Sequence, residues 1–82
     1  PALQGDRMKY RLLDDFEFEA ATPLEACETL RGQLMVPEPT IEEWLKGSAF
    51  RAKQWSGAIL RTDTPEHHIE DMIAAGLLTK LE

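Results

Sequence analysis

The sequence predicts an α+β domain in which a small antiparallel sheet of two or three strands packs against three short helices. Apolar and polar residues alternate over positions 9–20, as in half-buried strands. Three later segments each begin with a capping threonine and continue with apolar residues at helical spacing. With 82 residues the chain forms one domain, which we expect at residues 8–82. Residues 1–7 lack any such pattern, so we expect a cloning remnant or a disordered leader ahead of Met8.

Residues 9–20 are expected to form a β-hairpin. The apolar and aromatic residues share one parity, whereas the charged residues between them take the other. Asp14 and Asp15 interrupt the alternation, so either the chain turns there and pairs 9–13 with 16–20, or one strand carries a bulge. We favour the hairpin, although two aspartates lack the glycine that tight hairpin turns prefer. The inward residues would be Tyr10, Leu12, Phe16 and Phe18.

Three helices are predicted from their first residues, which are Thr22-Pro23, Thr40-Ile41 and Thr64-Pro65. Threonine is a good N-cap, and proline is tolerated in the first turn of a helix. Gly32 and Gly76 are placed to end the first and third helices, and the second should run to about Gln54, with Gly47 weakening its middle. The inner faces would carry Leu24, Cys27 and Leu30, then Ile41, Trp44, Leu45, Ser48, Ala49 and Ala52, with Trp55 as a further candidate, and finally Ile69, Met72 and Ile73.

The segments between and after the helices are shorter. Residues 33–40 contain two prolines and predict an extended connector. Residues 58–61 read as a short strand after a turn, and residues 77–81 as a short strand or a packed tail. A free sheet edge or the leucine-rich end would also allow a homodimer.

The charge of the chain is unevenly distributed. The net charge of −6 argues against a general nucleic-acid binder, and six acids without a base lie between Leu12 and Leu30. On a strand Glu17 and Glu19 would project from one face about 6.7 Å apart, with Asp14 and Asp15 extending the negative surface at the turn. This array either steers a basic partner or is the solvated outer face of the sheet.

The stretch RTDTPEHHIEDM, residues 61–72, is the strongest candidate for chemistry. His67 and Asp71 are four residues apart on the predicted helix, and His68 and Asp63 lie nearby. A zinc site needs three or four ligands, and this pattern supplies two on one face. We therefore interpret the stretch as a capped, solvated helix start, and we expect no catalytic residues, no metal and no cofactor.

A single cysteine, Cys27, predicts a buried apolar side chain without a disulfide. The chain also lacks an apolar run of about 20 residues that could span a membrane. We therefore expect a cytoplasmic protein.

Trp55 falls at a predicted helix end close to Arg51, Lys53 and Arg61. A tryptophan near basic residues is typical of protein–protein hot spots, but it can also cap a core. The same three bases would form the contact surface if the chain were a small dimeric regulator or antitoxin-like protein that binds nucleic acid.

Two stretches, FEFEAATPLEACETLR and RAKQWSGAILRTDTPEHHIEDMIAAGLL, resemble small accessory proteins of phages and integrated bacterial elements. The resemblance covers most of residues 8–82. Some such proteins bind and block host machinery, including CRISPR–Cas effectors, so the resemblance implies a binder and carries over no catalytic residue.

The sequence thus predicts a small acidic, non-enzymatic protein that binds a protein partner, with an anti-CRISPR-like inhibitor of host machinery as one form of it. The residues expected to contact the partner are Asp14, Asp15, Glu17, Glu19 and Trp55.

Overall fold

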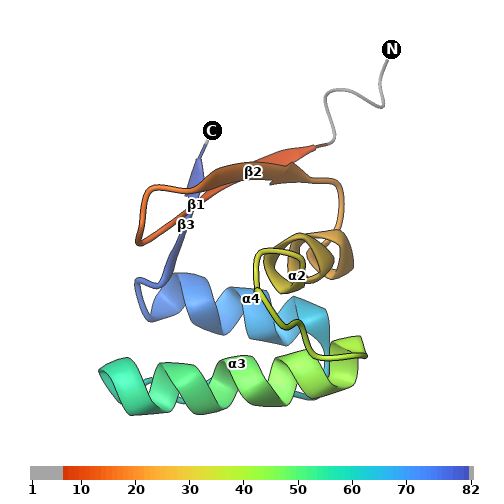
Figure 1. Ribbon diagram of the computed structural model, residues 1–82. Coiled ribbons are helices and arrows are strands. Elements are labelled where there is room, and N and C mark those ends of the chain that lie inside the picture. Colours follow the sequence, from red (N-terminus) through yellow and green to blue (C-terminus); the bar gives the residue numbers. More distant parts are fainter. Residues whose placement is uncertain (1–6, 82) are drawn as a thin grey trace.

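The computed structural model describes residues 7–81 and shows three layers (Figure 1). An antiparallel sheet forms one outer layer, two helices form the middle layer, and the longest helix forms the other outer layer. In chain order the elements are β1 (Met8–Leu12), β2 (Glu17–Ala20), α2 (Pro23–Arg31), α3 (Ile41–Ser56), α4 (Pro65–Ala74) and β3 (Leu78–Leu81). The predicted α+β architecture is confirmed. Except for Arg7, the leader predicted at residues 1–7 lies outside the described residues.

The sheet has the strand order β2-β1-β3, and both neighbouring pairs are antiparallel. Strands β1 and β2 form the predicted hairpin. Its turn uses Asp15 at a φ of 71°, a left-handed conformation that aspartate adopts more readily than most residues. The Asp14 carboxylate accepts a hydrogen bond from the Phe16 backbone N–H at 3.1 Å. The two aspartates therefore make the turn without a glycine.

All three predicted N-caps are present. The hydroxyl oxygens of Thr22, Thr40 and Thr64 accept backbone N–H groups three residues later at 3.0–3.1 Å. Helix α3 continues two residues past its predicted end and stops at Gly57, whose φ of 75° suits glycine. None of the helices within residues 7–81 combines the length and the apolar character needed to cross a membrane.

The core lies between the inner face of the sheet and helices α2 and α4, and it continues between those helices and α3. Leu24 does not take part, contrary to the prediction, because its side chain is 46% exposed. Helix α2 buries Ala26, Cys27 and Leu30 instead, so its inward stripe is displaced from Leu24. Strand β3 settles the two alternatives for residues 77–81, since Leu78 is buried beside β1.

The prediction of a strand at residues 58–61 is wrong. This segment is extended, but it lies outside the sheet and connects α3 to α4. The sheet ends at β2 and β3, so no strand is beside it. Side chains of α4 bind the Arg61 backbone instead: Asp71 accepts its N–H at 2.8 Å, and His68 Nδ1 lies 2.7 Å from its carbonyl oxygen.

Candidate functional site: a groove beside helix α3

The outer face of the sheet combines acidic and basic side chains. Glu17 lies opposite Arg11 and Glu19 lies opposite Lys9 in the hairpin register. The Glu17 carboxylate is 3.8 Å from Arg11 and 3.7 Å from Lys9, and Glu19 is 3.5 Å from Arg7. Glu17 and Glu19 of the predicted carboxylate array are thus paired with bases of β1 and with Arg7 just before it.

The predicted contact residues are distributed over two outer layers of the molecule. Asp14 and Asp15 are exposed in the hairpin turn, at the end of the sheet layer. Trp55 lies in the last turn of α3, in the opposite outer layer. Its side chain is 90% exposed, which excludes the interpretation as a core-capping residue. The acidic residues and Trp55 therefore belong to different surfaces.

The two adjacent histidines occupy different environments. His68 is fully buried; its Nδ1 lies 2.7 Å from the Arg61 carbonyl oxygen, and its Nε2 lies 2.9 Å from the Ser48 hydroxyl. A carbonyl oxygen only accepts, so Nδ1 carries the proton and Nε2 accepts from Ser48. The ring also packs edge-on against Trp44, with centroids 5.3 Å apart. His68 therefore joins α3, α4 and the segment between them.

The contact between Ser48 and His68 has the atoms of a nucleophile and its base. Both residues are buried, however, and Ser48 lies in the middle of α3, where the helix itself uses the surrounding backbone N–H groups. No helical N–H is therefore free to stabilise an oxyanion there. Burial lowers the pKa of His68, although the bond to Arg61 opposes this effect, and the ring stays neutral. The pair is suited to holding helices together.

The other polar residues of the stretch from 61 to 72 form separate pairs. His67 Nδ1 lies 2.9 Å from Asp63, and Asp71 binds the Arg61 guanidinium through both carboxylate oxygens at 2.9 and 3.0 Å. The Arg61 hydrogen bonds lower the pKa of Asp71 to about 2. His67 and Asp71 thus have different partners. Residues 7–81 contain no group of three His, Cys, Asp or Glu side chains placed to hold a metal ion.

Cys27 is fully buried, as predicted. Burial, and to a smaller extent the Glu28 charge, raises the pKa of its thiol to about 12. A thiol that stays protonated is a poor nucleophile, so this residue acts as a small apolar side chain.

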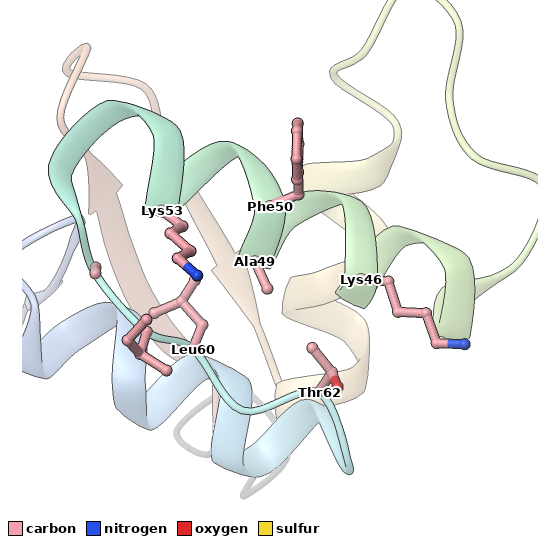
Figure 2. A pocket seen from close by; sticks show the side chains of 8 residues that line it. Lys46, Ala49, Phe50, Lys53, Leu60 and Thr62 are labelled. Carbon is pink, nitrogen blue, oxygen red and sulfur yellow. The ribbon is translucent and has the colours of Figure 1, made fainter.

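A groove of about 340 Å³ lies between α3 and the segment 58–62 (Figure 2). Ala49 of α3 points into it, while Lys53 and Lys46 stand toward its two ends, and Phe50 points away from the segment onto the rim. The α3 groove is lined by Lys46, Ala49, Phe50 and Lys53 of the helix and by Ala58, Ile59, Leu60 and Thr62 of the segment. Phe50 is 64% and Ile59 is 73% exposed, so large apolar side chains border it.

A second groove of about 250 Å³ lies on the opposite side of α3, at its C-terminal end. Its lining is mostly apolar, and Leu60 contributes to both grooves. The Trp55 groove is lined by Ser48, Arg51, Ala52, Trp55, Leu60, Met72 and Leu77. Trp55 lies on the same side of α3 as the buried Ser48 and Ala52, but the C-terminal end of α3 extends past α4 (Figure 1).

Two of the three bases predicted to contact nucleic acid are bound to carboxylates of the protein. Arg51 pairs with Glu38 at 3.0 Å, and Arg61 pairs with Asp71. The Glu38 carboxylate lies over Gly47, where a Cβ would require this flexible side chain to shift. Within residues 7–81, Lys46 and Lys53 form no ion pair, so the unpaired positive charge of α3 borders the α3 groove.

The sequence interpretation identified Trp55 and Lys53 but missed Lys46, Phe50 and Ile59. The helical spacing of Lys46, Phe50 and Lys53, which places them on the side away from the buried residues, was a signal available for α3. No comparable signal existed for Ile59, because it was assigned to a strand.

Comparison of the chain with protein-family models, curated proteins and solved structures found no match.

Proposed function

We propose that this chain is a non-enzymatic protein-binding module whose contact surface surrounds the C-terminal half of α3. The observation that carries the proposal is the exposure of three large apolar side chains within ten residues, namely Phe50, Trp55 and Ile59. Burying such a side chain stabilises a fold by about 1.5–3 kcal/mol, and this chain leaves three of them in water beside two grooves.

The residue types and the charge suit a protein partner. Aromatic side chains are enriched at binding hot spots, and the unpaired Lys46 and Lys53 supply local positive charge on a protein of net charge −6. The outer face of the sheet is the weaker candidate, because its ion pairs balance the charge of Glu17 and Glu19.

Capture from a bacterial lysate, with the immobilised full chain and mass spectrometry, tests the surface. The triple variant Phe50→Ser, Trp55→Ser, Ile59→Ser should lose the partner. The matched control, Leu13→Ser, Met35→Ser, Val36→Ser, removes three exposed apolar side chains elsewhere and should keep the partner. Circular dichroism should match the unaltered chain in both cases.

The double variant Glu17→Lys, Glu19→Lys tests the acidic face against this surface. It should keep the partner at physiological salt. Loss of capture in this variant, together with retention in the α3 triple variant, would show that the sheet is the contact surface. The identity of the captured protein also tests the predicted relation to inhibitors of host machinery.

A homodimer remains a prediction, and light scattering after size exclusion measures it. Leu78 is buried in the core, so this residue of the leucine-rich end is not available to a second copy. A second copy would instead pair with the edge strands β2 or β3.

A further inference from the structure

In the segment 58–62, the backbone N–H and C=O groups of Arg61 are hydrogen-bonded, whereas those of Leu60 and Thr62 are not bonded to any of the described residues. In an extended chain, the N–H and C=O groups of successive residues point to opposite sides. Both backbone groups of Arg61 face α4, where Asp71 and His68 bind them. Those of Leu60 and Thr62 therefore point away from α4. Across residues 7–81, no hydrogen bond reaches the backbone of either residue.

Leu60 and Thr62, whose backbone groups have no hydrogen bond within residues 7–81, both line the α3 groove. Ala58, Ile59, Leu60 and Thr62 line this groove, and the intervening Arg61 does not. An extended backbone with unpaired groups is a template for another strand. Here the template lies beside a groove whose floor is formed by Ala49 and Leu60 (Figure 2).

The charges on α3 define the chemistry of the occupant. Lys46 and Lys53 are seven residues apart, about 10.5 Å along a helix axis. Carboxylates four residues apart on one face of an extended peptide are separated by about 13 Å, which two flexible lysines can span. An apolar residue midway between them projects from the same face and would meet Ile59 and the groove floor.

We propose that the α3 groove binds an extended acidic segment of a partner protein, which adds as a strand to residues 58–62 and places carboxylates on Lys46 and Lys53. This inference rests on the proposed function and names its partner class and binding mode. Main-chain hydrogen bonds would supply affinity and the two lysines would supply selectivity for acidic sequence.

Nuclear magnetic resonance of the full chain tests the proposal with a capped heptapeptide that has glutamate at positions 2 and 6, valine at position 4 and threonine elsewhere, so that both glutamates and the valine share one face. Amide shifts should be confined to the α3 groove. With free peptide at about ten times its Kd, amide hydrogen exchange of Leu60 and Thr62 should slow about tenfold, because only a paired strand protects them. The same peptide with lysine in place of glutamate should not bind.

The double variant Lys46→Glu, Lys53→Glu should weaken peptide binding by roughly tenfold, the effect of two exposed ion pairs. The variant Lys9→Glu, Lys80→Glu has the same net charge and should bind like the unaltered chain.

Three outcomes would overturn the inference. Groove shifts without protection of Leu60 and Thr62 would show that the surface binds by another mode, which leaves the proposed function intact. Failure of the peptide to bind at millimolar concentration would exclude this partner class, whereas the capture experiment would still decide the proposed function. Binding of an oligothymidylate in place of the peptide would assign the lysines to phosphate.

Discussion

The outer face of the sheet and the groove side of α3 differ in whether their exposed charged side chains have partners within the fold. On the sheet, Glu17 and Glu19 have basic partners in β1 or just before it. On α3, Lys46 and Lys53 are unpaired within residues 7–81, and the apolar Phe50 and Ile59 stand in water beside them. The charged side chains Glu17 and Glu19 of the sheet face are thus paired within the fold, whereas the groove side of α3 has unpaired lysines and exposed apolar side chains.

The difference separates residues that stabilise the fold from residues available to a partner. Helix α3 is attached from its inner side through Trp44, Ser48 and the buried His68. Its outer side contributes little packing. Substitutions on the two sides of α3, and on the sheet face, should therefore differ widely in their effect on stability.

The largest contrast is expected between the two tryptophans of α3, which lie on the same side of the helix but differ in how far other elements cover them. Trp44 is 3% exposed and Trp55 is 90% exposed. Trp44→Ala should lower the free energy of unfolding by about 4 kcal/mol because it leaves a cavity. Trp55→Ala should change it by less than about 0.5 kcal/mol. Urea denaturation measures both, and a large loss for Trp55 would mean that it supports the fold rather than binding.

Removal of the buried imidazole should have the next largest effect. His68→Ala leaves the Arg61 carbonyl and the Ser48 hydroxyl without their partner and opens a cavity, so we expect a loss of about 3 kcal/mol. Ser48→Ala removes one hydrogen bond and should lose about 1 kcal/mol. Equal losses in the two variants would contradict the bridging role of His68.

Acidification should weaken the α3 attachment through the same residue. Burial lowers the pKa of His68 in the folded protein. Below pH 6.5, the ordinary pKa of histidine, His68 is therefore protonated in the unfolded chain but stays neutral in the folded protein until the pH reaches the lower folded pKa. The free energy of unfolding should decrease as the pH falls from about 6.5 toward the lower folded pKa. Denaturation at pH 7.5 and at pH 5 measures this change, and equal stability at the two values would refute it.

Substitutions on the sheet face should also have small effects. Glu17→Gln and Glu19→Gln each break exposed ion pairs, which contribute about 0.2–1 kcal/mol at low salt and less when screened. Thermal unfolding at low and at high salt measures these losses, and the variants should have nearly the same rank in stability under both conditions. A loss comparable to that of His68→Ala would erase the contrast between the two regions.

Local signals in the sequence determined most of the elements. The three threonine caps, the parity of residues 9–20 and the apolar spacing of the helices act over a few residues, so they can be read without knowing the rest of the fold. Asp14 and Asp15 were read as a turn for the same reason, and the structure confirms it.

The tertiary structure decided how the residues of different elements meet. The bases opposite Glu17 and Glu19, the burial of His68 against Ser48, and the pairing of Arg61 with Asp71 all join positions that local patterns treat separately. Ala58–Arg61 has the composition of a strand, but the sheet ends at β2 and β3, and side chains of α4 bind the Arg61 backbone. Burial and charge pairing depend on three-dimensional neighbours, which is why the α3 groove became visible only in the folded chain.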